Sequence, residues 1–95
     1  MGEYMVAPQY ALVKLPKNVS YNQAARFGYL GTMYSAMRKS GLGPGKTMLV
    51  NGISGTLGIG GALFGLAMGV TKILGTGRDK KLLERVKALA PNRIE

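Results

Sequence analysis

The segment TMLVNGISGTLG, from Thr47 to Gly58, carries the strongest structural signal in the chain. Its first five residues are apolar in the middle and predict a short buried strand. Gly52, Gly55 and Gly58 then form a glycine-rich turn before a helix. The helix is expected from Ile59 to Met68, with its apolar stripe at Ile59, Leu63, Leu66 and Ala67. A sharp turn at the start of a helix exposes backbone N–H groups at its positive end, which is typical of a pyrophosphate-binding turn.

A second strand and another helix are predicted after this unit. Lys72–Thr76 is a short β-type run, and Asp79 can cap a helix that ends before Pro91. The apolar residues of that helix recur at helical spacing: Leu82, Leu83, Val86, Leu89 and Ala90. The order strand, helix, strand, helix predicts an α/β fold, a partial Rossmann-type doubly wound parallel sheet. A third strand could start in residues 92–95.

The residues before Thr47 predict a lead-in strand and two helices. Tyr10–Leu15 is a short β-type run. Ser20 and Gln23 have the spacing of a capping box, in which each side chain bonds to the other residue's backbone N–H. A helix through residues 24–27 is expected next, and then a second helical stretch over residues 32–39. We therefore expect a lead-in strand and helices, followed by one β-α-β unit and a closing helix.

Composition limits the chemistry that the chain can perform. The 95 residues include no cysteine and no histidine, the two best ligand types for zinc, so no metal site is predicted. Thirteen Lys and Arg against four Asp and Glu give a net charge of +9, which favours an anionic partner. The basic residues never form a run longer than two, so a nucleic-acid-binding tail is not predicted. No secretory signal is found at the start, and a cytoplasmic location is the expectation.

The residues that end the second strand indicate which dinucleotide the turn prefers. In such folds an acidic side chain at this place binds the ribose 2′-hydroxyl of NAD, whereas a small residue beside an arginine accommodates the 2′-phosphate of NADP. Gly77 occupies this place and Arg78 follows it. Arg78 is the candidate 2′-phosphate ligand, because a guanidinium can make two parallel hydrogen bonds to a phosphate. The alternative is that Arg78 is a solvated residue before the helix capped by Asp79.

The uncharged stretch from Thr47 to Thr71 allows a second interpretation, as a membrane span. Its 25 residues are long enough to cross a bilayer. Gly61, Gly65 and Gly69 have the spacing that lets transmembrane helices approach closely. The many glycines and polar residues dilute its hydrophobicity, however, so no membrane partner is predicted.

Landmarks along most of the chain resemble the medium-chain dehydrogenase/reductase superfamily, which includes zinc-type alcohol dehydrogenases and quinone oxidoreductases. They are Leu15-Pro16, Ala24-Ala25, residues 31–36, residues 42–45, the glycine turn and Ala67-Met68-Gly69. The resemblance implies a lead-in segment, residues 1–19, from the catalytic-domain side and a partial NAD(P)-binding Rossmann domain, residues 20–95. It also implies a cofactor site whose members are Thr32, Gly52, Ser54, Gly55, Thr56, Leu57, Gly58, Gly77 and Arg78. The alternative for Thr32 is a residue at the start of a helix that satisfies its own backbone.

Departures from the family pattern weaken the case for catalysis by the chain alone. Zinc-containing members often place a cysteine where this chain has Gly28. No catalytic acid, base or metal ligand can be named. We therefore expect an NADP(H)-binding segment of an alcohol dehydrogenase/reductase-type oxidoreductase that is inactive by itself and self-associates through open sheet edges. The alternatives are a non-catalytic remnant or interaction module that keeps the fold, and a small basic membrane protein.

Overall fold

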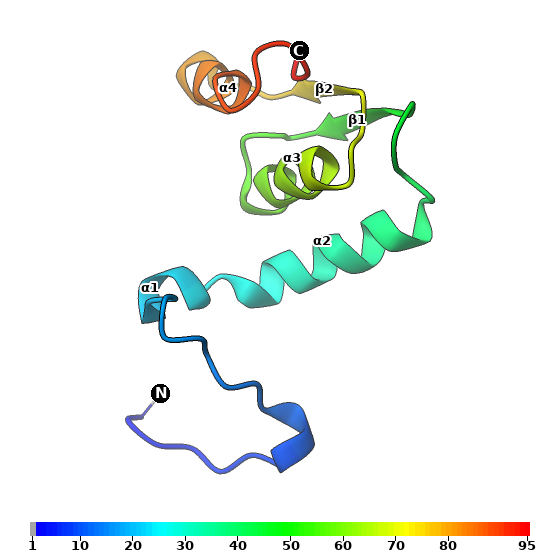
Figure 1. Cartoon of the computed structure of the whole chain (residues 1–95). Helices are drawn as coiled ribbons and strands as arrows, with labels where there is room; N and C mark the ends of the chain where they lie inside the picture. The colour runs from blue at the N-terminus through cyan, green and yellow to red at the C-terminus, as the bar shows by residue number, and fades with distance from the viewer. Residues whose placement is uncertain (1) are drawn as a thin grey trace.

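The computed structural model describes residues 2–95 and shows an α/β arrangement (Figure 1). A 3₁₀ turn, η1 (Gln9–Ala11), comes first. The remaining elements are α1 (Tyr21–Ala24), α2 (Phe27–Lys39), β1 (Thr47–Asn51), α3 (Thr56–Ala67), β2 (Lys72–Thr76) and α4 (Lys80–Lys87). The predicted order of strand, glycine turn, helix, strand and helix is confirmed.

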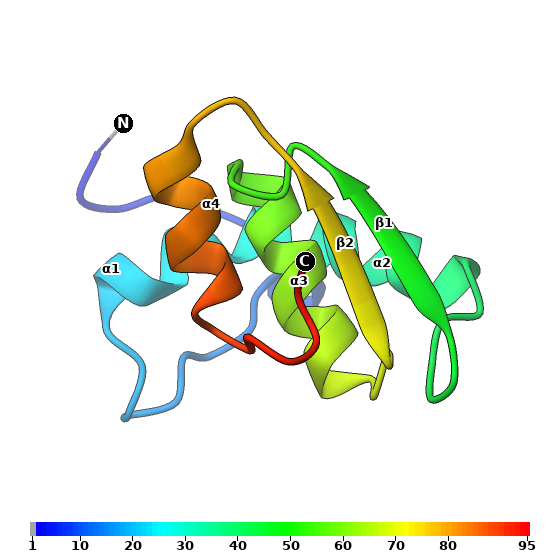
Figure 2. The ribbon, with the colours of Figure 1, turned by 90° about the horizontal axis from the view of Figure 1, so that it is seen from above.

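The two strands form a parallel sheet, as predicted. The register pairs Thr47 with Lys72 at one end and Asn51 with Thr76 at the other. On the free edge of β2, Ile94 forms a parallel bridge with Ile73. The Ile73 N–H donates to the Arg93 carbonyl at 2.7 Å, and the Glu95 N–H donates to the Ile73 carbonyl at 2.9 Å. The third strand expected in residues 92–95 therefore begins beside β2, where Figure 2 shows the C-terminus of the chain.

Helix α3 lies between the sheet and α2, so the molecule has three layers here (Figure 1). Its glycines permit this close packing on two sides. A Cβ atom at Gly65 would come within 2.8 Å of Met48 Cε on β1, and one at Gly60 would come within 3.2 Å of Leu30 Cδ2 on α2. The buried residues of α3 are Gly58, Gly60, Gly61, Ala62 and Gly65.

The predicted apolar stripe of α3 is therefore wrong in part. Ile59 is 37% exposed and Leu63 is 46% exposed, whereas the glycines and Ala62 face the interior. The physical reason is that α3 is packed on both sides at short range, and only small residues fit there. Hydrophobic periodicity identifies large side chains and misses a buried face made of glycine.

Within residues 2–95, the core is one cluster of eight buried hydrophobic side chains, drawn from α2 through the C-terminus. They are Met37, Met48, Ile53, Ala62, Val70, Ile73, Val86 and Ile94. Burial of a side chain of the size of Ile73 stabilises the fold by about 1.5–3 kcal/mol. The opposite side of the sheet lacks such cover within residues 2–95: Leu49, next to buried Met48, is 61% exposed. Strand β1, which is expected to be buried, is thus buried on one face only.

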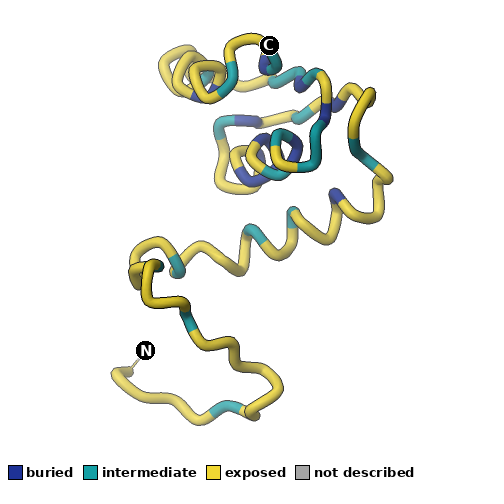
Figure 3. The backbone as a smooth tube through the Cα atoms, in the orientation of Figure 1, coloured by how far each residue is buried: buried dark blue, intermediate teal, exposed yellow. Residues whose placement is uncertain are grey.

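The lead-in strand predicted over Tyr10–Leu15 is wrong. The segment contains part of η1 and then irregular chain that pairs with no other strand in the described residues. Tyr10 is 92% exposed and Val13 is 91% exposed, and Figure 3 shows the chain before α1 as almost wholly exposed. β-type residues form a stable strand only where another strand supplies hydrogen bonds.

The capping residues predict where helices begin more accurately than the hydrophobic periodicity does. The capping box is confirmed: Ser20 Oγ accepts from the Gln23 N–H, and Gln23 Oε1 accepts from the Ser20 N–H. Helix α2 is one continuous element from Phe27, so the separate start expected near Thr32 is wrong. Asp79 caps α4 as predicted.

The uncharged stretch divides into a strand and a helix. None of the helices in residues 2–95 is long and apolar enough to cross a membrane. Gly61 packs against Met33, Gly65 packs against the sheet, and Gly69 has a φ of +80° just after α3. The three evenly spaced glycines thus have separate roles within one chain.

Candidate functional site

Each glycine of the turn between β1 and α3 meets a different steric demand. Gly52 has a φ of +76°, a conformation that side chains with a Cβ rarely adopt. A Cβ atom at Gly55 would lie 3.2 Å from the Gly52 carbonyl oxygen. A Cβ atom at Gly58 would lie 2.2 Å from the same oxygen, which leaves no room for one. The pattern therefore arises from the geometry of the turn.

Backbone hydrogen bonds join this turn to the end of β2. The N–H groups of Gly52 and Ile53 both donate to the Thr76 carbonyl at 2.9 Å. The Thr76 hydroxyl also donates to Asn51 Oδ1 at 2.9 Å. The carboxyl ends of both strands are thereby held together beside the start of α3, where open α/β sheets bind ligands.

The start of α3 is open to an anion. Gly55 is its N-cap residue and supplies no side-chain cap. Within residues 2–95, the N–H groups of Thr56, Leu57 and Gly58 donate to no protein oxygen. These donors and the helix dipole together favour a negatively charged group at this position.

A hollow of about 530 Å³ opens between the turn and the end of β2. Its lining residues are Gly52, Ser54, Gly55, Thr76, Gly77, Arg78 and Asp79. Five of the predicted site residues are therefore brought together in one place: Gly52, Ser54, Gly55, Gly77 and Arg78. Three more, Thr56, Leu57 and Gly58, form the first turn of α3 directly after it.

Gly77 faces Ser54 across this hollow. A Cβ atom at position 77 would lie 3.2 Å from Ser54 Oγ and 2.8 Å from Leu83 Cδ2 of α4. An acidic residue at this position would therefore have to displace the Leu83 side chain as well as change the charge. Any side chain at position 77, acidic or not, would meet the end of the Leu83 side chain.

The charges in the hollow are one arginine and one carboxylate. The carboxylate of Asp79 accepts from the N–H groups of Lys81 at 2.9 Å and Leu82 at 3.2 Å, so it caps α4. Arg78 takes no part in an ion pair with any residue of the described chain. The role of Arg78 as a phosphate ligand remains a prediction.

Thr32 is the predicted site residue that the structure does not bring to the hollow. It lies within α2, where its hydroxyl donates to the Gly28 carbonyl at 3.2 Å. Such a bond satisfies the threonine within its own helix. A contact between Thr32 and the nicotinamide end of a cofactor remains a prediction.

Sequence patterns miss Thr76 and Arg26 near the site and predict Asp79 only as a helix cap. Thr76 and Asp79 line the hollow, and Arg26 reaches the start of α3 from the turn between α1 and α2. Its Nη1 donates to Thr56 Oγ1 at 3.2 Å. No spacing rule joins two residues 30 positions apart, so this contact is visible only in the folded chain.

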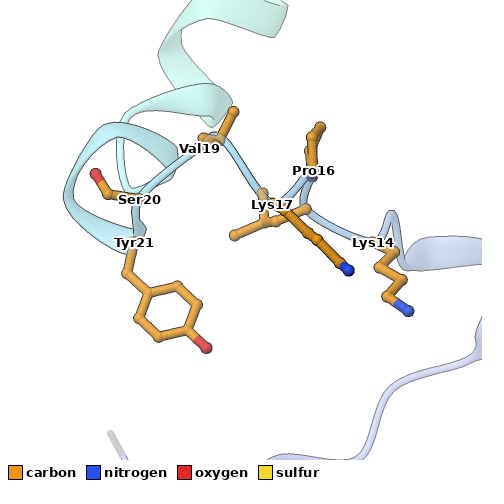
Figure 4. A pocket seen from close by; sticks show the side chains of 7 residues that line it. Lys14, Pro16, Lys17, Val19, Ser20 and Tyr21 are labelled. Carbon is orange, nitrogen blue, oxygen red and sulfur yellow. The ribbon is translucent and has the colours of Figure 1, made fainter.

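A second hollow, of about 600 Å³, lies in the segment that leads into α1 (Figure 4). It is formed by the chain around α1, and its lining includes Lys14, Lys17 and Tyr21. Tyr21 is 86% exposed, and the Ser20 hydroxyl is used in the capping box. The hollow has neither a glycine turn nor a long helix start, so we place the candidate site at α3.

Residues 2–95 contain no group of three or more His, Cys, Asp or Glu side chains that could hold a metal ion. The residues of the candidate site are instead backbone donors, hydroxyls and cations. They suit the binding of a phosphorylated molecule.

The chain is similar to known proteins in both sequence and structure. No protein-family model matches the chain. A quinone oxidoreductase-like protein 2 homolog of Nematostella vectensis is 36% identical over 85 residues, which cover 87% of this chain and 23% of that protein. The quinone oxidoreductase of Thermus thermophilus, whose structure is known also in complex with NADPH, superposes with a TM-score of 0.79 at 30% identity. That match covers 93% of this chain and 29% of the other.

An NAD-dependent alcohol dehydrogenase has a similar structure. Its TM-score is 0.80 at 26% identity, with 97% of this chain and 27% of the dehydrogenase covered. The chain thus spans between about a fifth and a third of the length of these relatives. One of these structures is known in complex with NADPH, and the other belongs to an NAD-dependent enzyme. The chain is homologous to a segment of the quinone oxidoreductases and alcohol dehydrogenases of the medium-chain dehydrogenase/reductase superfamily, as the sequence landmarks indicate.

Proposed function

We propose that the chain binds NADP(H) at the turn between β1 and α3, as part of the nucleotide-binding region of an oxidoreductase. The observation that carries the proposal is the meeting of an uncapped helix start, a glycine turn without room for side chains, and unpaired Arg78 around one hollow. Backbone N–H groups of Thr56, Leu57 and Gly58 hold the pyrophosphate in this proposal. Arg78 holds the 2′-phosphate.

The residues present fit such a cofactor. The turn presents backbone instead of side chains, so a pyrophosphate can approach closely. Ser54 supplies a hydroxyl on the same side, and Gly77 leaves the ribose position free of negative charge. When bound, the nicotinamide ring supplies hydride chemistry, which belongs to the cofactor and not to the protein.

The activity of the longer protein is part of the same proposal. We propose hydride transfer between NADP(H) and an alcohol, aldehyde, ketone or enone, in a cytoplasmic location. For the chain alone we expect cofactor binding without turnover. Turnover of NADPH that follows the purified chain through a sizing column would contradict this expectation.

Titration of NADPH and NADH into the full chain tests the proposal. Loss of a charged hydrogen bond usually costs about 1.5–3 kcal/mol, and about 1.4 kcal/mol is a factor of ten. Arg78→Ala should therefore weaken NADPH about 10- to 100-fold and leave NADH almost unchanged. Lys39→Ala, which removes an equal charge at the far end of α2, is the matched control and should change neither. Equal affinities of the wild type for both nucleotides would contradict the role of Arg78.

The converse change needs a second substitution. Gly77→Asp should repel the 2′-phosphate and accept from the ribose hydroxyls of NADH, but its Cβ would meet Leu83. Gly77→Asp combined with Leu83→Ala removes this obstruction. The double variant should prefer NADH, with Leu83→Ala alone as the control.

A non-catalytic remnant is the alternative function. In that case the fold would persist while neither dinucleotide bound. Cooperative thermal unfolding of the chain together with no saturable binding of NADPH or NADH would favour this alternative.

A further inference from the structure

We infer that Arg26 is a second phosphate ligand, which binds the pyrophosphate of the dinucleotide while Arg78 binds the 2′-phosphate. The inference rests on the proposed function, because it assigns a role within the same site. It adds a residue from outside the β-α-β unit. It also predicts that the two arginines have separable effects on ligand choice.

The position of Arg26 is set by two helices. It is the N-cap residue of α2, with φ of −102° and no side-chain capping bond. Its side chain leaves α2 and reaches Thr56, the first residue of α3, at 3.2 Å. Leu30 and Met33 of α2 approach Gly60 and Gly61 of α3 further along, so the beginnings of both helices lie together. Arg26 is exposed, and its bond to Thr56 places the guanidinium beside the open start of α3.

The charge of Arg26 is unusual for this position. A cation near the N-terminus of a helix is unfavourable, because that end of the helix is already positive. Neither α2 nor α3 has an acidic residue in its first turn, and no ion pair to Arg26 occurs within residues 2–95. The only carboxylate of the hollow, Asp79, caps α4 instead. An anion bound at the start of α3 would offset this concentration of positive charge.

The hydrogen-bonding capacity of Arg26 also exceeds its use. A guanidinium has five N–H donors, and the structure records one bond from this side chain, to Thr56. The remaining donors can make paired bonds to phosphate oxygens. Thr56 itself belongs to the predicted phosphate-binding turn. The arginine therefore lies next to the atoms that would hold a pyrophosphate.

Two small nucleotides separate the two arginines. ADP carries a 5′-diphosphate and no 2′-phosphate, whereas 2′-AMP carries only the 2′-phosphate. Arg26→Ala should weaken ADP about tenfold and leave 2′-AMP unchanged. Arg78→Ala should weaken 2′-AMP about tenfold and leave ADP unchanged. With whole dinucleotides, Arg26→Ala should weaken NADPH and NADH alike, since both contain the pyrophosphate.

The full chain is used throughout, with Arg38→Ala as the control for a basic residue elsewhere on α2. Calorimetric affinities are measured at several NaCl concentrations, and thermal melting is recorded for every variant. In Arg26→Ala the dependence of ADP affinity on salt should become shallower, because one screened charge pair is lost. A role limited to holding α2 against α3 would not produce that change.

The outcomes are distinct. If the wild type binds ADP and the dinucleotides and Arg26→Ala binds them equally well, the inference is overturned and the proposed function stands. If Arg26→Ala melts at a lower temperature and weakens ADP and 2′-AMP by the same factor, Arg26 is structural and the inference is overturned. If the wild type binds no dinucleotide, the proposed function fails together with the inference. Arg26→Lys keeps the positive charge and should recover part of the ADP affinity. If Arg26→Lys binds ADP no more tightly than Arg26→Ala, the charge-based contact is overturned.

Discussion

The β-α-β unit, residues 47–76, and the lead-in segment, residues 2–19, differ sharply although both contain β-type runs. In the unit, Thr47–Asn51 pairs along its whole length with β2 and lies on α3. In the lead-in segment, Tyr10–Leu15 pairs with nothing in the described chain, and Val13 is 91% exposed. The comparison teaches that local composition is insufficient for a strand. Partner strands and a covering helix decide which run becomes one.

Substitutions in the glycine turn should destabilise the β-α-β unit more than substitutions elsewhere in it. Gly58→Ala places a Cβ 2.2 Å from the Gly52 carbonyl oxygen, a contact with backbone that cannot yield cheaply. We expect a loss of about 3 kcal/mol or more in the free energy of unfolding, measured by urea denaturation. Gly28→Ala is the matched control on α2, where a Cβ meets nothing within 4 Å. It should stabilise the chain by up to about 1 kcal/mol through helix propensity, and equal destabilisation by both changes would refute the steric account.

Arg93 links the C-terminal residues to the β-α-β unit by hydrogen bonds. Its substitution should cause the next largest loss in the free energy of unfolding. Its guanidinium donates to the Val70 carbonyl at 3.1 Å and to the Leu66 carbonyl at 3.3 Å, at the negative end of α3. Arg93→Ala should lower the free energy of unfolding by about 1.5–3 kcal/mol. Arg85→Ala, on α4, should lower it by less than about 0.5 kcal/mol. A cost for Arg93→Ala as small as that of Arg85→Ala would show that the tie contributes little.

The two faces of the sheet offer a third test. Met48 is buried under α3, whereas neighbouring Leu49 is 61% exposed on a strand whose outer edge is open in residues 2–95. Open edges promote pairing between chains, so we predict self-association of the chain. Leu49→Lys should shift the protein toward monomer in a sizing column with little change in stability. A sharp monomer peak for the wild type would contradict the prediction.

Substitutions in the lead-in segment should have the smallest effect on the free energy of unfolding. Val13→Ser replaces an exposed side chain without a strand partner and should alter the free energy of unfolding by no more than about 0.5 kcal/mol. Val70→Ser, at a fully buried position of the core, is the comparison and should cost several times as much. A large effect of Val13→Ser would show that the lead-in run packs against the unit after all.

Much of the unit was predictable because its signals are local. The strands Thr47–Asn51 and Lys72–Thr76 agree with the expected bounds, and Ser20 and Asp79 mark helix starts by capping. A cap needs only the residues within one turn. Gly52, Ser54 and Gly55 follow β1, and Gly77 and Arg78 follow β2. Because parallel strands end at the same edge of a sheet, the sequence predicts that these residues lie close together.

The remainder depends on contacts between distant elements. The inward face of α3 consists of glycines and Ala62, so hydrophobic periodicity selected Ile59 and Leu63 on its exposed side. Arg26 contacts Thr56 only because α2 packs along α3. The residue type at Gly77 indicates a cofactor preference, whereas its proximity to Leu83 depends on how α4 packs beside the end of β2. Each of these features forms only when elements that are distant in the sequence pack together.

The most direct test of the central claim is a map of backbone amide shifts by nuclear magnetic resonance as NADPH is added to the full chain. The account predicts the largest shifts at Gly55, Thr56, Leu57, Gly58 and Arg78, because these residues surround the proposed phosphates. Residues 9–17 of the lead-in segment should not shift. Saturable shifts confined to Lys14, Lys17 and Tyr21, at the hollow near α1, would contradict the account.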